Sequence, residues 1–402
     1  MKQHFITPWR RLAPLLCAGA AVAAGATLSG DALAQTTVAC SSLPGATYLV
    51  GSASGQSYIA ALSAAAAANN ITYIFQSADS CVAVEALLIG GLLTGTATYW
   101  TPGTAGPVAN TCSLDANGTP VDIAVSDVYF TSCPGHATPL PTPPSEAFGP
   151  IQIFGFAVPR ASSQTAISAE AAYFVFGFGA ARAQVQPWTE DTRVLIRTDQ
   201  SGIQQLPARA INTNASTWKG VTTPAGTIIS TFGSATNADS YIGVLPAFLA
   251  DGMRDKVKFL AYRHYKQRFA YWPDSKENLF NKRNVRDGHY PIWGPLHFIA
   301  APATQLSANA ARFLGYFNGN SPLPQGVNLI DLEIAAHTVP QCAMRVQRQS
   351  ELGDISAYKP SAPCGCYFES KADGQTSCRA CTTNANCNAT TETCSDGYCE
   401  AR

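Results

Sequence analysis

The sequence predicts an α/β protein of two lobes, followed by a small disulfide-rich module at the C-terminal end. Apolar strands alternate with helix-like stretches over most of the chain, which is typical of βαβ architecture. The chain has 402 residues, enough for two lobes that each bury a core. Eight of its 13 cysteines crowd between residues 342 and 399, in a polar stretch that cannot build a core of its own.

The first 34 residues have the pattern of a secretory signal peptide. A basic start with Lys2 and Arg10 precedes an apolar stretch over 12–28, and the A-x-A pattern at 32–34 offers a cleavage site. The apolar stretch is short and rich in Ala and Gly, which favours cleavage over a retained membrane anchor. We therefore expect an exported protein, periplasmic or extracellular, that is not an integral membrane protein.

In the first lobe, three predicted strands run into turns that are rich in Ser and Asp. We expect strands that begin at Tyr48, Ile71 and Asp122, with helices over 57–70 and 82–93 between them. Ligands of open α/β sheets bind at the carboxyl ends of the strands. The serines that follow the first two strands are therefore candidates for ligand contact, and so is Asp127 after the third.

A fourth turn has the features of an anion seat. The apolar run at 194–196 leads into Arg197, and Ser201-Gly202 then opens a predicted helix over 204–210. Free N–H groups at a helix start favour anions, and an Arg can grip oxyanions with two parallel hydrogen bonds. A structural ion pair of Arg197 with Asp191 or Asp199 is the alternative. For Asp127 the alternative is a role as a turn or helix cap.

The order of four motifs, GSASG, YIFQSADS, DIAVSD and IRTDQSG, resembles the phosphate-binding protein family. These are extracytoplasmic solute-binding proteins of ABC importers, and the resemblance covers about residues 43–330. It implies the two-lobed type II periplasmic-binding fold. It also implies capture of a small oxyanion, phosphate first, between the lobes, and an ABC permease as partner.

The resemblance assigns roles to individual residues. Arg197, Ser201 and Gly202 stand where the family grips the oxyanion, and Asp127 stands where its carboxylate accepts a proton from the ligand. Ser80 matches the serine after the second strand, and Ser54 or Gly55 matches the hydroxyl residue of the first turn. Ile203 replaces a usual Thr. With Ser52 as a further donor, the predicted ligand-binding set is Ser52, Ser54, Gly55, Ser80, Asp127, Arg197, Ser201 and Gly202.

We expect a binding protein rather than an enzyme, with no cofactor and no metal. No nucleophile elbow, P-loop, dinucleotide fingerprint or zinc-protease motif occurs in the sequence. Lys+Arg and Asp+Glu balance at 26 each, which argues against nucleic acid as a partner. Two alternatives are a secreted phosphoesterase on the same scaffold and an adhesion or matrix protein with a vestigial site. The apolar Ile203 favours the second of these.

The cysteines are predicted to form disulfides, since the expected compartment is oxidising and no His residues complete a zinc pattern. We expect two bridges within the first lobe and the rest in the C-terminal tail, whose order should come from bridges rather than from packing on the lobes. The tail's partner is not identifiable. The predicted disulfide cysteines are Cys40, Cys81, Cys112, Cys133, Cys342, Cys364, Cys366, Cys378, Cys381, Cys387, Cys394 and Cys399.

We predict the following organisation. Residues 1–34 form the signal peptide, 35–340 the two-lobed domain, and 341–402 the Cys-rich tail, with lobe 1 at about 43–150 and 285–340 and lobe 2 at about 151–284. Residues 94–121 form an insertion. The proline-rich stretch 134–150 is a stiff loop without strand, and 151–158 is a strand that crosses between lobes. The charged stretch 256–287 is a solvated face or a partner-docking surface rather than a nucleic-acid patch.

Overall fold

The computed structural model describes residues 37–136 and 142–401. The predicted signal peptide and part of the proline-rich loop, at 137–141, lie outside the described residues. In the described part of the chain, no helix combines the length and apolar character needed to cross a bilayer.

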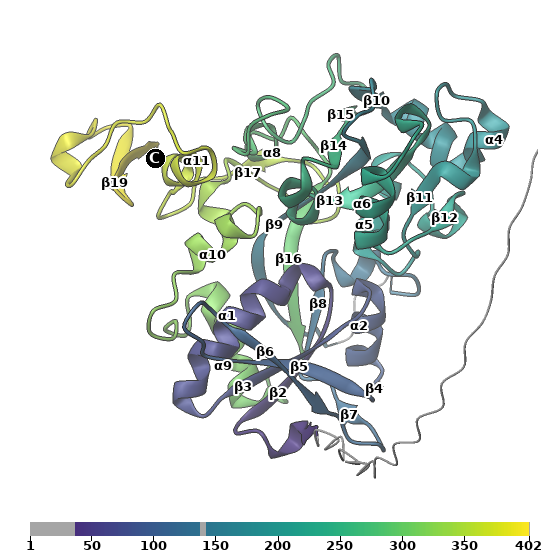
Figure 1. Ribbon diagram of the computed structural model, residues 1–402. Helices are drawn as coiled ribbons and strands as arrows, with labels where there is room; N and C mark the ends of the chain where they lie inside the picture. Colours follow the sequence, from purple (N-terminus) through teal and green to yellow (C-terminus); the bar gives the residue numbers. More distant parts are fainter. Residues whose placement is uncertain (1–36, 137–141, 402) are drawn as a thin grey trace, which may run out of the picture. The chain divides into compact units, whose positions relative to one another are not determined.

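One 12-stranded sheet runs through both lobes (Figure 1). The first-lobe strands lie on one side of two long crossing strands, and the second-lobe strands lie on the other. The order is β1 (Val38–Ala39), β6 (Val108–Ser113), β5 (Thr96–Thr101), β3 (Thr72–Ser77), β2 (Ala46–Gly51), β8 (Ile123–Ser126), β16 (Trp293–Ala300), β9 (Ser145–Pro159), β13 (Ile242–Pro246), β11 (Val194–Ile196) and β12 (Val221–Thr222), with β14 (Val257–Phe259) paired to β9.

The two crossing strands, β9 and β16, pair antiparallel and join the lobes. β16 also pairs with β8 of the first lobe, while β9 continues to pair with β13 and β14 of the second. Within the first lobe, β2 is parallel to both β3 and β8, so the carboxyl ends of these three strands meet at one edge. The predicted ligand turns therefore converge.

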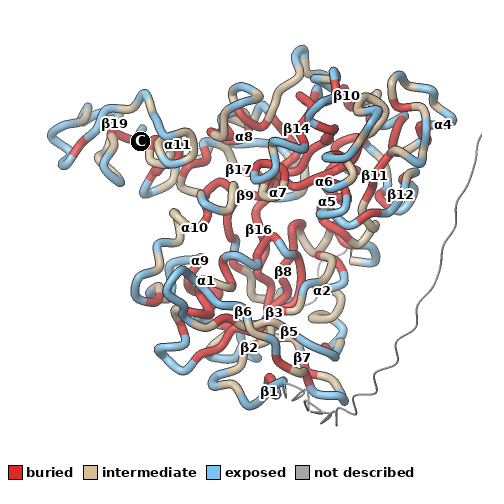
Figure 2. Tube along the Cα trace, in the orientation of Figure 1, coloured by how far each residue is buried: buried red, intermediate tan, exposed pale blue. Residues whose placement is uncertain are grey.

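Helices pack on both halves of the sheet, and the buried positions follow the strands (Figure 2). The first half carries α1 (Gln56–Ala66), α2 (Ser80–Leu88), α9 (Ala308–Asn318) and α10 (Leu329–Ala335). The second half carries α3 (Ala169–Ala172), α4 (Ala180–Ala183), α5 (Gly202–Ala210), α6 (Ala225–Gly233), α7 (Ala247–Ala250) and α8 (Arg283–Arg286). Four small two-stranded sheets complete the described fold: β4 (Leu92–Leu93) with β7 (Thr119–Pro120), β10 (Ala166–Ser168) with β15 (Ala261–Arg263), β17 (Val346–Gln347) with β18 (Ser356–Ala357), and β19 (Glu392–Ser395) with β20 (Tyr398–Ala401).

This architecture, with the disulfide-rich C-terminal module, confirms the predicted fold class. The predicted end of one helix was wrong. The helix expected over 82–93 ends at Leu88, because Gly90 takes a positive φ of 73° that stops it. The predicted insertion at 94–121 contains β5 and β6, which pair as a hairpin near one edge of the sheet.

The proline-rich stretch was expected to exclude strand, yet β9 begins at Ser145 and contains Pro150. The reason lies in a β-bulge on the ladder between β9 and β16, where the register shifts between Pro295 and His297. Gly149 and Pro150 together face a single residue of β16 there, so the missing N–H of the proline costs no ladder hydrogen bond.

The charged stretch at 256–287 is only partly solvated. Lys282 is 2% exposed and forms ion pairs with Asp251 at 2.6 Å and Asp274 at 3.0 Å. Arg254 pairs with both carboxylates as well. The prediction of a solvated face was therefore wrong for this buried ion cluster, which charge pattern alone could not place inside.

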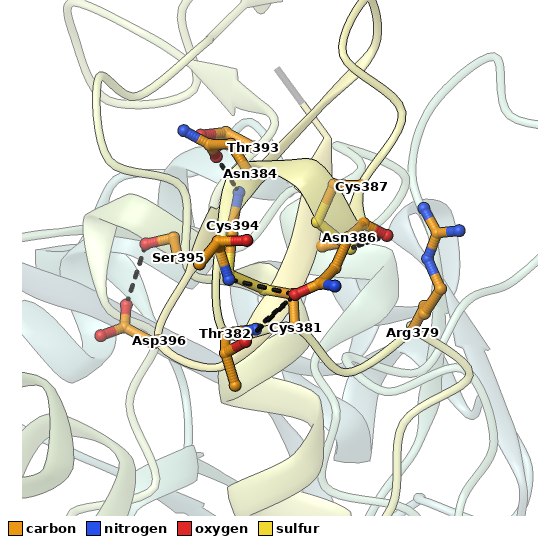
Figure 3. The surroundings of a disulfide bond; sticks show 12 residues. Arg379, Cys381, Thr382, Asn384, Asn386, Cys387, Thr393, Cys394, Ser395 and Asp396 are labelled. Atoms are coloured by element: carbon orange, nitrogen blue, oxygen red, sulfur yellow. Dashed lines mark hydrogen bonds between the residues drawn. A yellow bond between two sulfur atoms is a disulfide. The ribbon is translucent and has the colours of Figure 1, made fainter.

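All twelve cysteines of the described residues pair in six disulfides. Two bridges lie in the first lobe, as predicted, and the pairs are Cys40–Cys112, Cys81–Cys133, Cys342–Cys364, Cys366–Cys378, Cys381–Cys394 and Cys387–Cys399. Around the last two bridges, Asn384 accepts a hydrogen bond from the N–H of Cys394 and Asn386 accepts one from the N–H of Thr382 (Figure 3).

The tail is not ordered by bridges alone. The helix α11 (Gly365–Asp373) buries Phe368 and sets Glu369 against the buried Arg286 of α8 at 2.8 Å. The N–H of Phe280 also donates to Asp373 at 2.6 Å. The expectation that the tail does not pack on the lobes was therefore wrong for its first part. The domain boundary at 341 stays a prediction.

Candidate functional site

The carboxylate of Asp127 is the centre of the predicted anion seat. Asp127 follows β8 directly and is 1% exposed. Ser52 donates to it at 2.7 Å, Ser54 at 2.5 Å and Ser80 at 3.3 Å. The three serines come from the turn after β2 and from the start of α2, because parallel β2, β3 and β8 end at one edge. Four of the predicted ligand residues therefore form one hydrogen-bonded cluster.

The approach of β2 to β8 depends on a glycine. Gly51 has a φ of 142°, and a side chain there would begin 2.0 Å from the carbonyl oxygen of Val125. The close approach lets the N–H of Ser52 donate to that oxygen at 2.9 Å. Gly55 is buried in the next turn, where its N–H donates to the carbonyl of Ser52. The small-residue turn thus aims the two serine hydroxyls at Asp127.

Burial dominates the electrostatics of this carboxylate. Desolvation raises the pKa of Asp127 above its usual range, while the hydroxyls of Ser54, Ser52 and Ser80 lower it in part. The charge of His297 is a smaller stabilising influence. No Lys or Arg of the described residues contacts Asp127. The acid is therefore held by neutral donors, an arrangement that suits a proton shared with a ligand.

The second lobe contacts the predicted anion seat directly. Gly202 begins α5, and a Cβ added to it would lie 2.6 Å from Cβ of Asp127 and 2.9 Å from Oγ of Ser80. Ser201, the residue before, is 3% exposed and its carbonyl accepts from the N–H groups of Gln204 and Gln205. Only a residue without a side chain fits at 202. The structure therefore brings the α5 start to the seat, with the serine hydroxyls committed to Asp127.

Arg197 lies one contact away from this cluster. It follows β11, donates to the carbonyl of Thr223 at 2.9 Å, and pairs with Asp79 at 3.3 Å. Asp79 precedes Ser80 and also accepts from the hydroxyl of Thr198 at 2.5 Å. The Nε atom of Arg197 is buried without a partner. The partner is thus neither Asp191 nor Asp199, the two acids considered from sequence, but an acid of the other lobe.

Two residues at the seam between the lobes were missed in the sequence. Asp79 was visible in the QSADS turn, directly before a predicted site residue, but nothing local shows that it reaches Arg197. Gln152 on β9 is 1% exposed and pairs with Gly294 of β16 in the ladder, and its amide lies beside Tyr58. A lone Gln inside an apolar strand was the available signal for it.

No protein-family model matches the chain, and no curated protein matches it. Among solved structures, it is similar to a possible phosphate binding protein from Planctomyces limnophilus, with 10% identity over 74% of this chain and 94% of that chain and a TM-score of 0.42. A putative phosphate ABC transporter substrate-binding protein with bound phosphate from Clostridium perfringens has 10% identity, covers 73% and 99%, and has a TM-score of 0.48.

An ABC-type phosphate transport receptor from Vibrio cholerae has 13% identity, coverage of 73% and 99%, and a TM-score of 0.47. At these identities and scores, the ligand of this chain has to be inferred from its own residues.

Proposed function

We propose that this chain is an exported solute-binding protein that captures a small oxyanion, with phosphate preferred, between its two lobes. The observation that carries the proposal is the convergence of Ser52, Ser54 and Ser80 on the buried Asp127, with the start of α5 at Gly202 facing them from the other lobe. Hydroxyls and helix-start N–H groups are donors suited to oxyanions. Export is supported by the signal-like N-terminal pattern and by six disulfides.

Ligand entry requires the seam between the lobes to open. In the structure the serine hydroxyls donate hydrogen bonds to Asp127, and Gly202 packs against this cluster. Arg197 forms an ion pair with Asp79. A further bond joins the N–H of Cys81 to the carbonyl of Gln200 at 3.0 Å. We infer a hinge motion about β9 and β16 that separates these contacts, after which the anion takes over the hydroxyls and Arg197.

Asp127 would set the choice of anion. A carboxylate that faces an anion needs a proton between them. Phosphate keeps a proton near neutral pH and can donate it to Asp127, whereas sulfate carries none and would face the carboxylate unpaired. The transport partner in this proposal is an ABC permease, and no catalytic step is assigned.

The test is calorimetric titration of the oxidised protein with phosphate and with sulfate. Phosphate should bind saturably and better than sulfate, and Arg197→Ala should weaken it at least about tenfold, because a charged hydrogen bond is worth about 1.5–3 kcal/mol. Arg193→Ala is the matched control, since Arg193 lies in the same lobe but pairs with Glu190 at 3.1 Å.

A vestigial seat is the second candidate, favoured by one observation: every serine hydroxyl of the cluster already has a partner in the structure. Absence of phosphate binding by the folded protein would support it and would overturn the proposal. Equal affinity of Arg197→Ala and the parent would remove Arg197 from the site.

A further inference from the structure

A cavity remote from the anion seat lies between the two-lobed body and the Cys-rich tail. Its volume is about 830 Å³, within the size range of ligand pockets. The two-lobed body contributes Arg286, the first part of the tail contributes Arg345 and Lys359, and the disulfide-rich end of the tail contributes Arg379 and Glu400. The bridges Cys342–Cys364 and Cys366–Cys378 border the cavity and fix its walls.

Of the four cations that line this cavity, Arg286, Arg345 and Arg379 pair with carboxylates, and Lys359 has no ion-pair partner among the described residues. The two acidic side chains of the cavity are already occupied. Glu400 accepts from the N–H groups of Cys366 at 2.7 Å and Tyr367 at 3.1 Å, and so caps the start of α11. Glu392 pairs with Arg379 at 3.0 Å.

Arg286 supplies a free donor in the wall of the cavity. It is 1% exposed, its Nε donates to the carbonyl of Ala343 at 2.8 Å, and its Nη1 pairs with Glu369 at 2.8 Å. Its Nη2 has no acceptor among the described residues. Burial lowers the pKa of Arg286, and the charge of Glu369 offsets this only in part. Arg286 is therefore ion-paired through Nη1 and keeps Nη2 available as a donor.

A glycine keeps this donor open. A Cβ added at Gly365 would lie 2.5 Å from Nη2 of Arg286 and 3.5 Å from Oε2 of Glu400. Any side chain at 365 would thus fill the space in front of the guanidinium. Lys359, which lines the same cavity, is exposed and has no ion-pair partner among the described residues. The free Nη2 of the ion-paired Arg286 and the unpaired ammonium group of Lys359 thus line one cavity.

We propose that this junction cavity is a second ligand site, which takes a small organic polyanion whose carboxylate or phosphate groups bind Arg286 and Lys359. Met344, Tyr358 and Pro360 line the same space and would contact the carbon skeleton of the ligand. The anionic groups can belong to a free small molecule or to acidic side chains of a partner polypeptide, since both present the same chemistry. The proposal is independent of the anion seat and of its ligand.

The experiment is calorimetric titration of the full oxidised chain with two probes, citrate and a hexaglutamate peptide, with glucose as the uncharged control. At least one anionic probe should bind saturably with one site per chain, and the affinity should fall as salt is raised to about 0.15 M. Binding of citrate alone assigns a free anion, and binding of the peptide alone assigns acidic side chains. Glucose should not bind.

Two variants test the site. Lys359→Glu should weaken the probe at least tenfold, and so should Gly365→Ala, which places a methyl group in front of Nη2 of Arg286. Lys276→Glu makes the same charge change on an exposed residue outside the cavity, and Gly226→Ala adds a methyl group where nothing lies within 4 Å; both should bind as the parent does.

Circular dichroism checks that each variant is folded. The proposal is overturned if neither anionic probe binds the parent saturably. It is equally overturned if Lys276→Glu loses as much affinity as Lys359→Glu, or if Arg197→Ala abolishes binding while Lys359→Glu does not.

Discussion

Buried acids of the two lobes have different partners: cations surround two of them in the second lobe, and serine hydroxyls surround Asp127 in the first. Asp251 and Asp274 are 6% and 4% exposed, and both contact the buried Lys282 and the guanidinium of Arg254. Asp127 is 1% exposed and contacts only hydroxyl donors from serines. The first arrangement places cations against its carboxylates, whereas the second leaves a buried carboxyl group without a cation in contact.

The pKa of Asp251 shifts in the opposite direction to that of Asp127, while the pKa of Asp274 is raised by burial, which the charges of Lys282 and Arg254 do not reverse. Burial raises the pKa of Asp251, but the charges of Lys282 and Arg254 outweigh it, so the net shift is downward. Burial also raises the pKa of Asp127, and three hydroxyls do not reverse it. A fold gains nothing in stability from an unpaired buried acid. Under the proposed function, Asp251 serves the structure and Asp127 serves ligand binding.

The largest expected effect comes from breaking the ion-paired group of the second lobe. Lys282→Met would leave Asp251 and Asp274 buried with only Arg254 to share, and removal of one partner from a buried ion pair costs about 3–5 kcal/mol. Urea denaturation should show this loss in the free energy of unfolding. Arg160→Ala is the control, because Arg160 pairs with Glu277 at the surface, with its side chain 51% exposed, and should cost less than about 1 kcal/mol. Equal costs for both variants would contradict the comparison.

A smaller effect is expected at the seat, and on ligand choice rather than on folding. Asp127→Asn removes the carboxylate that would repel an anion without a proton, such as sulfate. The ratio of phosphate affinity to sulfate affinity should therefore fall at least about tenfold. Asp122→Asn is the matched control, since Asp122 is a half-buried acid of the same lobe that accepts from the N–H of Tyr48 at 2.7 Å. An unchanged ratio in Asp127→Asn would leave that residue with only a capping role.

The same variant has a pH signature without ligand. Because the folded-state pKa of Asp127 is raised, the folded protein binds the proton more tightly than the unfolded chain does. Its contribution to stability is therefore present at low pH and is lost as pH rises through the raised pKa. Asp127→Asn should flatten this fall in urea denaturation measured across acidic to neutral pH.

Local patterns in the sequence predicted much of this site, because a strand that ends in a Ser or Asp turn is a local feature. Ser52, Ser80 and Asp127 follow from it once β2, β3 and β8 are placed in one sheet. Pro150 shows a limit of the same reasoning, since a bulge on the ladder to β16 allows a proline that propensity forbids.

Contacts between lobes lay beyond such reasoning. Asp79 and Arg197 are separated by more than a hundred residues, and only the closed arrangement of the lobes brings them to 3.3 Å. The buried position of Lys282 was also missed, although its partner Asp251 belongs to the same lobe, because Asp251 lies outside the charged stretch that drew attention to Lys282. Charge pattern indicates how many charges a segment has, but not which of them tertiary packing will bury in pairs.

The smallest expected effect concerns this inter-lobe pair. Asp79 contacts both Arg197 and Thr198, so under the proposed function it would compete with an incoming anion for the guanidinium. The side chains of Arg197 and Asp79 are 16% and 23% exposed, and pairs near the surface are worth up to about 1 kcal/mol. Asp79→Ala should therefore raise phosphate affinity by up to about fivefold.

Asp199→Ala is the control, because it removes a negative charge two residues from Arg197 but breaks no contact with it. The control separates the release of the guanidinium from a general change in electrostatic potential. A gain of equal size in both variants would assign the effect to potential alone. A loss of affinity in Asp79→Ala would mean that Asp79 orients Arg197 for the ligand, in which case the pair belongs to the binding site rather than competing with it.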